Sequence, residues 1–593
     1  MNFKSVSRPT WSFIAVSILL SVFALSAAHA SGDEPQAAPK KGWSFEELKR
    51  VPIQNGGRVK PLDSFAREVV LHLTGSRKFE GWEPAEMVLS IMAQPKQWDS
   101  RPLIKVQRAD VKRQLMLDSE RTRFSVGELF GNSALLQYAQ HMGSGIESQM
   151  SKAPDPKANP REEELKRLLD RLTLFHNLVS GDAWTVVPQL AVSDRKEAPA
   201  WLALSAVPAA STEKETTQES ETAQAIRLRF LATVAAYFMN NQSNFESSTR
   251  QLREMVEAQV PGYTENVAPV VRAETLYNRV RPFQWAWIMY LVAGLTFMAM
   301  IWLRSGREGT DSRASRVMGW TAGSLMVSAF LFHISGFALR CYIAGRPPVS
   351  NMYESIVWVS FGAVFFAMLI FAFQRQRVLL ATGSMLGALG LIAADAAPTL
   401  MDPGLHPLVP VLRSNYWLMV HVLTITLGYA AFALTMGLGN VTMFQFLRGG
   451  DGLMARVNRM NQLTYRAMQF GVVLLAAGTI LGGVWADYSW GRFWGWDPKE
   501  VWALIALLTY LAVLHGRFAG WVGSFGFAAW TIVCFASVVM AWYGVNFVLG
   551  VGLHSYGFSA GGQGIVGMFV LAQLIFVAAV AWVNHRRKVS AKS

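Results

Sequence analysis

The sequence predicts an all-α polytopic membrane protein, with about nine transmembrane helices after a mainly helical exported N-terminal domain. Hydrophobic residues make up 51% of its 593 positions, which is high for a soluble protein of this length. They gather in runs of roughly 18 to 25 residues, the length that crosses a hydrocarbon core of ~30 Å. Arginine and lysine are concentrated in alternate loops between these runs, as expected for helices that alternate in direction.

Residues 1–30 form the first element and have the pattern of a targeting segment. Lys4 and Arg8 precede an apolar stretch that runs from Trp11 to Ala28. The small residues Ala28 and Ala30 fit a signal-peptidase cleavage site. An uncleaved N-terminal anchor would show the same pattern, so both interpretations stay open. Either one places residues 31–283 on the exported side of the membrane.

Residues 31–283 are predicted to form a mainly helical periplasmic domain. Asn159 and Pro160, followed by three glutamates, are typical of a helix start. A second helical stretch is expected from about Ala223 to Val260, after a polar segment at 210–222 that is typical of a linker. The apolar face of the first helix is formed by Leu165, Leu168, Leu169, Leu172 and Phe175.

Residues 284–593 are predicted to form the membrane module. Its apolar runs span approximately 285–303, 317–337, 354–373, 378–396, 417–446, 467–486, 500–516, 521–543 and 565–583.

The loop charges predict how this module is oriented. The loops that this order places inside hold fifteen arginines and lysines, whereas the outer loops hold only Arg340, Arg346, Arg413, Arg492 and Lys499. This asymmetry puts the N-terminal domain and the loop at 485–502 in the periplasm and the C-terminus in the cytoplasm. It also accounts for much of the net charge of +14, so no nucleic-acid partner is expected.

The two cysteines exclude several kinds of chemistry. Cys341 and Cys534 lie far apart, and no CxxC pair occurs, which excludes a thiol-redox motif and a cysteine zinc site. The absence of CxxCH means that the chain is not itself a c-type cytochrome. No residue is identified as a dedicated catalytic acid or base. For Asp497 and Glu500, structural pairing with Lys499 or Arg492 is the preferred interpretation.

The densest sequence signal is WADYSWGRFWGWDPKEVW at 485–502. Five tryptophans in this one outer loop, interleaved with Gly491 and Gly495, predict a flat apolar platform for a large planar ligand. An interfacial belt is the alternative, although a belt normally spreads its tryptophans over many helices.

Three histidines are placed by this topology where they could serve such a ligand. His421 and His554 are predicted on the outer face beside the tryptophans, where they could be the axial ligands of an iron porphyrin. His515 is predicted at the inner end of the helix that starts in the platform, ~27 Å from Asp497 at 1.5 Å per residue. Each could instead be an interfacial polar residue, and His333 is expected to be structural.

The run WGRFWGWDPKEVWALI, followed by LHGR, resembles the WWD-domain signature of the heme-handling CcsA (ResC) family of System II cytochrome c biogenesis. Three further segments match in order, RCYIAGRPPVSNMYES at 340–355, WLMVHVLTITLGYAAF at 417–432 and YGVNFVLGVGLHSYGF at 543–558. The resemblance covers about residues 320–585. Residues 51–68 more weakly resemble the stretch that precedes the CcsA module in fused CcsB–CcsA proteins.

The resemblance implies roles for particular residues. His421 and His554 match the family's two external heme-ligating histidines, and His515 matches its transmembrane histidine, proposed to receive heme inside. Trp490, Trp494, Trp496 and Asp497 match the WWD core, and Gly495 between the tryptophans is counted with them among the expected heme-binding residues. The function implied is transport of heme b across the membrane and its presentation for covalent attachment to apocytochrome c.

The resemblance also implies partners. Fused relatives carry a CcsB half with its own membrane helices, whereas this chain has one hydrophobic segment before residue 285. A holocytochrome c synthetase would then need a separate CcsB (ResB)-like protein in the same inner (cytoplasmic) membrane. Its substrate would be apocytochrome c, and thiol-reducing proteins are a further candidate partner. The alternatives are a non-catalytic heme-binding scaffold, a CcmC- or CcmF-like module of another maturation system, and a solute transporter.

Overall fold

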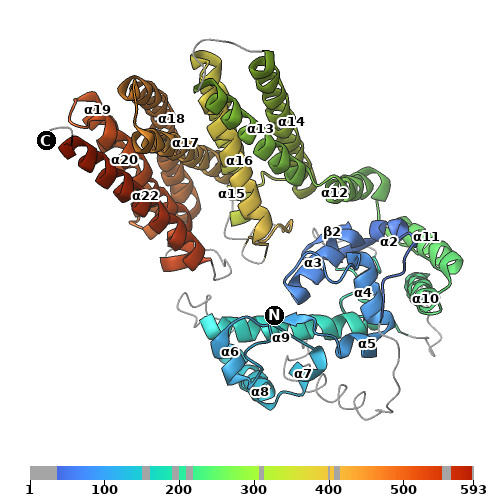
Figure 1. Ribbon diagram of the computed structural model, residues 1–593. Helices are drawn as coiled ribbons and strands as arrows, with labels where there is room; N and C mark the ends of the chain where they lie inside the picture. The colour runs from blue at the N-terminus through green and yellow to red at the C-terminus, as the bar shows by residue number, and fades with distance from the viewer. Residues whose placement is uncertain are drawn as a thin grey trace. The chain divides into compact units, whose positions relative to one another are not determined.

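The computed structural model describes residues 37–149, 160–189, 200–208, 218–305, 313–398, 401–406, 415–549 and 562–590. The segment predicted to be a signal peptide or anchor, residues 1–30, lies outside these ranges. Contacts divide the chain into two compact units, Met1–Thr275 and Leu276–Ser593 (Figure 1).

The first unit is mainly helical, and its core is built around buried aromatic side chains. Trp98 and Trp184 are fully buried, and the Trp184 ring packs edge-on against Phe230 with centroids 4.9 Å apart. Its elements are α2 (Glu46–Arg50), β1 (Pro52–Asn55), β2 (Arg58–Pro61), α3 (Leu62–Thr74), α4 (Pro84–Ala93), α5 (Pro95–Asp99), β3 (Ile104–Lys105), α6 (Ala109–Gln114), β4 (Arg123–Phe124), α7 (Val126–Phe130), α8 (Ser133–Gln149), α9 (Pro160–Ser180), η1 (Leu204–Ala206), α10 (Gln218–Phe238), α11 (Gln242–Gln259) and η2 (Tyr263–Val267).

Two local features of this unit differ from the sequence prediction. Strands β1 and β2 form an antiparallel hairpin that was not predicted, with Gly56 and Gly57 at positive φ in its two-residue turn. The helical stretch expected from Ala223 to Val260 is two helices, because Asn240 has φ +57° and the Asn241 side chain caps α11.

The second unit is a bundle of long apolar helices. Nine candidate spans among the described residues are long and apolar enough to cross a membrane, which confirms the predicted all-α polytopic fold. The chain reaches this unit through α12 (Ala268–Val280). The elements that follow are α13 (Pro282–Ser305), α14 (Arg313–Ala344), α15 (Met352–Gln374), α16 (Arg377–Ala396), α17 (Asn415–Arg448), α18 (Leu453–Trp490), α19 (Pro498–Phe518), α20 (Ser524–Val533), α21 (Phe535–Val539), η3 (Met540–Leu549) and α22 (Gln563–Ser590).

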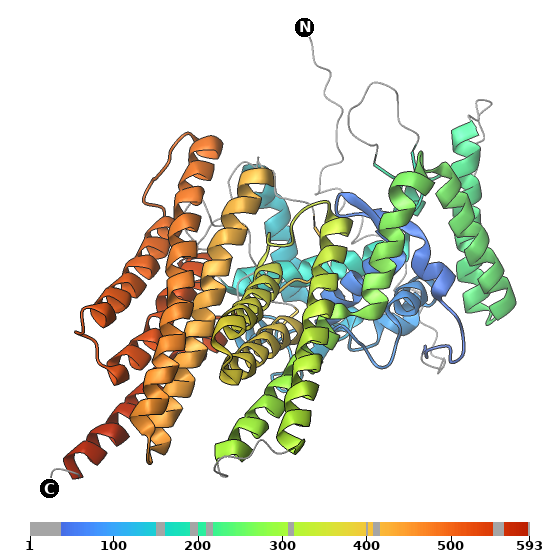
Figure 2. The same cartoon turned by 90° about the horizontal axis from the view of Figure 1, so that it is seen from above.

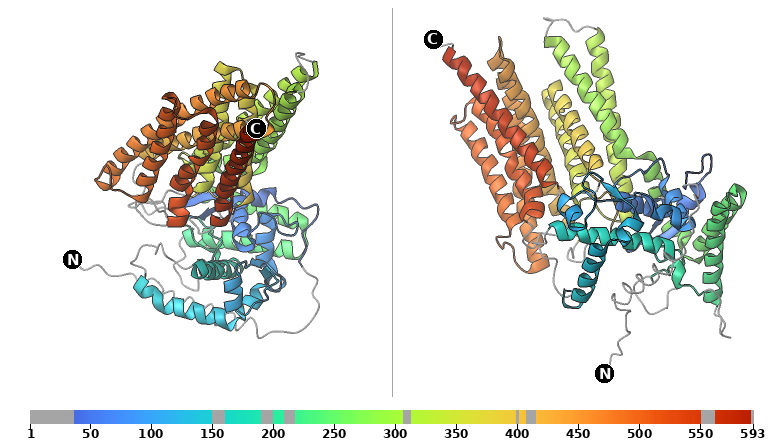
Figure 3. Two further views of the ribbon diagram at one scale, coloured as in Figure 1. Left: turned by 60° about the vertical axis from the view of Figure 1, so that its left-hand side comes forward. Right: turned by 60° about the horizontal axis from the view of Figure 1, so that its bottom comes forward.

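The pairing of α17 with α18 organises one half of this bundle (Figures 2 and 3). Glycines bring the two backbones together: a Cβ at Gly478 would lie 2.7 Å from the Ile425 Cα, and one at Gly428 would lie 2.9 Å from the Leu475 nitrogen. Small residues at a helix interface allow this close approach. Side chains on α17 therefore lie directly against the backbone of α18.

The eighth predicted span is segmented. Residues 521–543 were expected to form one helix, but α20 and α21 are followed by a π-helical stretch, η3, that continues to Leu549. In a π-helix the carbonyl of residue i bonds to residue i+5, which widens the turn, and such stretches are frequent at functional sites. In this chain η3 supplies Trp542 and Asn546 to the cavity described next.

Candidate functional site

One end of the bundle in the second unit contains a cavity with about 1060 Å³ of empty space, counted out to open solvent. It lies where α17 and α19 begin and where α18 and η3 end, with the start of α15 as a further wall. The described lining residues are Val349, Ser350, Asn351, Met352, Ser355, His421, Val422, Ile425, Thr426, Tyr429, Thr479, Gly482, Gly483, Trp485, Trp494, Lys499, Glu500, Ala503, Trp542 and Asn546.

His421 lines this cavity, and its ring orientation is fixed from both sides. Its Nδ1 lies 2.8 Å from the Gly478 carbonyl oxygen on α18, and its ring stacks at 13° on the buried Trp485, with centroids 6.0 Å apart. A carbonyl oxygen can only accept, so Nδ1 carries the proton and Nε2 carries the lone pair. Metal-binding histidines commonly donate their second ring nitrogen in this way.

Glycines of α18 provide the space for that ring. A Cβ at Gly482 would lie 2.6 Å from the His421 Cε1, and one at Gly483 would lie 2.6 Å from the Phe493 ring. Contacts this short do not occur at real Cβ atoms without a shift of the neighbour. The two glycines therefore let the His421 and Phe493 rings lie close against the α18 backbone.

The tryptophans predicted to form a flat platform have different orientations. Trp485 and Trp490 are tilted by 60°, and Trp494 and Trp496 are perpendicular. Of these four rings, Trp485 and Trp494 line the cavity, while Trp496 is 71% exposed. The rings therefore provide separate walls rather than one surface, and Trp542 of η3 adds an aromatic wall that the sequence analysis missed.

Asp497 starts α19 rather than facing the cavity. Its carboxylate accepts the Lys499 amide at 3.2 Å, and the Glu500 carboxylate accepts the Asp497 amide at 3.1 Å, which completes a capping box with Pro498 in the first turn. Glu500 also accepts the Gly495 amide at 2.8 Å. Both acidic side chains of WDPKE thus fix the turn that leads into the helix, in line with the structural interpretation of these charges.

The missing side chain of Gly495 makes room for a different neighbour from the one expected. The sequence analysis placed it between the tryptophans of a flat platform for the ligand. A Cβ there would lie 0.9 Å from the Arg492 Nη1, so the glycine makes way for the Arg492 side chain. That guanidinium lies 3.7 Å from the Glu500 carboxylate. Gly495 therefore supports the geometry of the loop.

Lys499 is a cavity residue that the sequence analysis considered only as a partner for acidic groups. It follows Pro498 in the first turn of α19, and its ammonium donates to the Asn546 side-chain oxygen at 3.2 Å. Asn546 in turn donates to the Trp542 carbonyl at 3.2 Å. The capping pattern DPKE could have placed Lys499 at the helix start, but no sequence signal indicates that η3 packs beside it.

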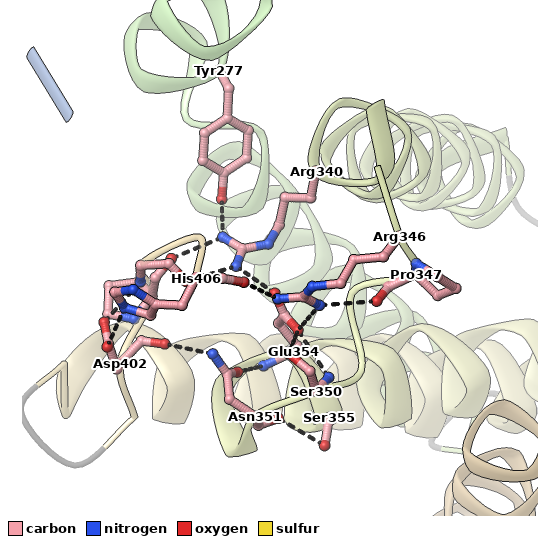
Figure 4. A network of polar contacts seen from close by, with 12 residues as sticks. Tyr277, Arg340, Arg346, Pro347, Ser350, Asn351, Glu354, Ser355, Asp402 and His406 are labelled. Atoms are coloured by element: carbon pink, nitrogen blue, oxygen red, sulfur yellow. Dashed lines mark hydrogen bonds and ion pairs between the residues drawn. The ribbon is translucent and has the colours of Figure 1, made fainter. Parts of the chain in front are cut away.

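A second polar cluster, the Arg340–Glu354–Arg346 network, lies next to the cavity wall at Ser350 and Asn351 (Figure 4). The Glu354 carboxylate, fully buried, lies 2.8 Å from Arg340 Nη2 and 3.2 Å from Arg346 Nη1. Ser350 donates to it through both its amide and its hydroxyl, each at 2.9 Å. All three charges come from the motif at 340–355, which had no assigned role.

The same network also forms hydrogen bonds to the neighbouring segment 401–406. Arg340 donates to the Pro403 carbonyl at 2.9 Å and to the Tyr277 hydroxyl at 3.2 Å, and Arg346 donates to the His406 carbonyl at 2.7 Å. These contacts tie residues 401–406 to the last turn of α12, the end of α14 and the segment before α15 (Figure 4). A buried carboxylate between two guanidiniums satisfies the rule that buried charges are paired.

The remaining histidines have contrasting surroundings. His515 is exposed on the last turns of α19, with Nδ1 2.8 Å from the Leu511 carbonyl. His333 is fully buried among Phe283, Phe337 and Phe361, and its Nε2 lies 3.1 Å from the Val357 carbonyl. Its aromatic surroundings fit the structural role expected for it.

His554, the second predicted axial ligand, lies outside the described residues. Within the described ranges, no group of three or more His, Cys, Asp or Glu side chains could hold a metal ion by itself.

The family match and the similar proteins described next agree on one family. Residues 349–554 match the family described as "Cytochrome C assembly protein". The cytochrome c biogenesis protein CcsA of Parasynechococcus marenigrum is 33% identical over 268 residues, which covers 40% of this chain and 86% of that protein. CcsA of Synechococcus sp. (strain RCC307) is 35% identical over 264 residues, 39% of this chain and 83% of that protein.

A longer relative extends the similarity into the first unit. The protein NrfI of Wolinella succinogenes is 28% identical over 510 residues, which covers 84% of this chain. The same match covers 53% of NrfI, so the chain spans about half the length of that relative.

Proposed function

Because the chain belongs to the CcsA family and therefore has a role in cytochrome c biogenesis, we propose that its cavity holds heme b for attachment to apocytochrome c. The observation that carries the proposal is His421. Its Nδ1 donates to the Gly478 carbonyl, which sets the tautomer with the lone pair on Nε2 that an iron ligand needs, and Gly482 provides the space that the imidazole occupies against α18.

The proposed ligand arrangement is bis-histidine, with His421 and His554 as the axial pair. Support for His554 is indirect. It follows η3 in the chain, and η3 lines the cavity through Trp542 and Asn546. The aromatic walls would hold the porphyrin against water, with Trp494 on the side of the outer loop. The exposed Trp496 would be available to an incoming polypeptide.

Heme would enter from the cytoplasmic side, where His515 is proposed to receive it. The exposure of His515 and its position near the opposite end of α19 from Lys499 support this role. The proposal includes the orientation predicted from loop charges in the inner membrane, with residues 31–283 and the loop at 485–502 in the periplasm.

In the attachment reaction, the main role proposed for this chain is to position the heme and the substrate. Each cysteine of a CxxCH substrate would add its S–H across a vinyl C=C, sulfur bonding to one carbon and hydrogen to the other, with no leaving group and no electron acceptor. Asp497 and Glu500 are committed to capping α19, so neither is assigned as an acid or base. The main contribution would be proximity and orientation.

The proposal includes a CcsB-like membrane partner. About half of NrfI lies outside its match to this chain, and fused relatives carry a second membrane module. Polar groups of heme in hydrocarbon are costly unless protein lines the path, which favours two modules over one.

Co-expression tests the function. In a host without its own maturation system, this chain, a CcsB-like protein and a CxxCH reporter should together yield cytochrome that keeps heme after denaturation, measured by heme staining on a gel. The chain with the reporter alone should yield none. Covalent product from the chain alone would contradict the two-component proposal. Bound heme without attachment in the full mixture would favour a scaffold instead.

A further inference from the structure

We propose that Lys499 binds a carboxylate of the ligand in the cavity and thereby fixes which edge of that ligand faces α19. The inference rests on the proposed function, in which the ligand is heme. A porphyrin of the heme b type carries its two propionates on one edge and its two vinyl groups elsewhere on the ring. Two axial ligands alone leave the ring free to rotate about the axis through iron. A fixed cation would remove that freedom.

The backbone that carries Lys499 is held in place. Its amide donates to Asp497, and the capping box of Asp497 and Glu500 fixes the turn on either side of Pro498. The ammonium therefore projects from a turn that is held in place by hydrogen bonds on both sides.

Among the charged groups around the cavity, the Lys499 ammonium is the one best suited to bind an anionic group of the ligand. Among the described lining residues, Lys499 carries the only ammonium or guanidinium group, and Glu500 carries the only carboxylate. The Glu500 carboxylate already accepts two amides and faces Arg492 at 3.7 Å. Asp497 attracts the ammonium electrostatically while its carboxylate accepts the Lys499 amide.

The ammonium has more N–H donors than its hydrogen bond to Asn546 uses. Lysine has three N–H donors, and the neutral side chain of Asn546 accepts one of them at 3.2 Å. An ammonium attracts a carboxylate more strongly in a water-poor cavity than at the surface. A propionate is therefore the ligand group that this corner of the cavity fits best.

The consequence concerns the reaction. With the propionate edge held at α19, the vinyl groups would face other walls of the cavity, and one ring orientation would be presented to every incoming CxxCH. Lys499 would then be a positioning residue that selects the orientation of the substrate. It would not take part in forming the thioether bond.

The test compares two ligands on the full-length purified protein in detergent. Hemin is titrated beside hemin dimethyl ester, which keeps the iron and the vinyl groups but lacks the propionate charges. The variants are Lys499→Met, Lys499→Arg and, as control, Lys588→Met, whose lysine is exposed in the last turn of α22. Binding is followed by the visible absorption band.

Lys499→Met should weaken hemin binding by roughly tenfold or more, as expected for loss of a charge-assisted hydrogen bond. It should leave the dimethyl ester unchanged, Lys499→Arg should recover part of the hemin affinity, and the control should bind like wild type. Unchanged hemin affinity in Lys499→Met would overturn the inference and leave the proposed function standing. Equal weakening of both ligands would show a structural role and also overturn it. Wild-type protein that binds neither ligand would overturn the proposed function as well.

Discussion

The Arg340–Glu354–Arg346 network and the cavity lie side by side in the second unit, yet they use buried charge in opposite ways. In the network, one carboxylate accepts from two guanidiniums and from Ser350, and all three charged side chains are buried. In the cavity, His421 and Lys499 each make a hydrogen bond to the protein, and both line the cavity.

The difference separates groups that hold the fold from groups that can receive a ligand. Most donors of the network are directed at carbonyls, a hydroxyl and a carboxylate, although the buried Nε atoms of Arg340 and Arg346 have no hydrogen-bond partner among the described residues, and a ligand would have to break the existing contacts. The cavity groups are oriented by their own hydrogen bonds, and the Lys499 ammonium has more donors than its bond to Asn546 uses. Ser350 connects the two regions, because it donates to Glu354 and also lines the cavity.

The largest effect is expected from breaking the network. Glu354→Gln removes the negative charge between two buried guanidiniums, and removal of one partner from a buried ion pair typically costs about 3–5 kcal/mol. Thermal unfolding of the purified protein in detergent should show a large loss of stability. Asp402→Asn is the matched control, since Asp402 pairs with His406 where both side chains are about half exposed or more, and such pairs contribute about 0–1 kcal/mol.

Equal, small stability losses in these two variants would show that the network is not what holds this end of the bundle. Glu354→Gln that remains stable yet loses heme would instead place the network among the ligand-binding groups.

A smaller, more selective effect is expected inside the cavity. Gly482→Ala places a Cβ 2.6 Å from the His421 ring, so the imidazole must move. We expect roughly tenfold less retained heme, with little change in unfolding temperature, because losing a metal ligand's positioning typically costs 10–100-fold in affinity. Gly323→Ala in α14, where a Cβ meets nothing within 4 Å, should change neither quantity. Full heme retention by Gly482→Ala would remove the support for His421 as an oriented ligand.

Much of the fold could be predicted from sequence because the bilayer imposes a simple rule of length and polarity. All nine predicted runs overlap the candidate spans of the described residues. The two misses in the first unit had local signals. Gly56-Gly57 is a favoured two-residue hairpin turn, and Asn240-Asn241 suits a helix break followed by a cap.

The site was harder to predict because its geometry depends on contacts between distant segments. His421 and Trp494 were identified from their motifs and do line the cavity. The partner of His421 is a backbone carbonyl on another helix, which no motif in the sequence reports. The ring angles of the tryptophans and the placement of Asn546 beside Lys499 depend on how α18, α19 and η3 pack. Roles for His515 and His554 stay predictions.

The most direct test of the central claim is the visible spectrum of the purified protein with and without the His421 side chain. Wild-type protein should retain heme with a bis-histidine spectrum. His421→Gly should lose that spectrum and its maturation activity with the CcsB-like partner, and added imidazole should restore part of both by occupying the vacated axial position. A His421→Gly variant that keeps the wild-type spectrum and full maturation activity without imidazole would contradict the account.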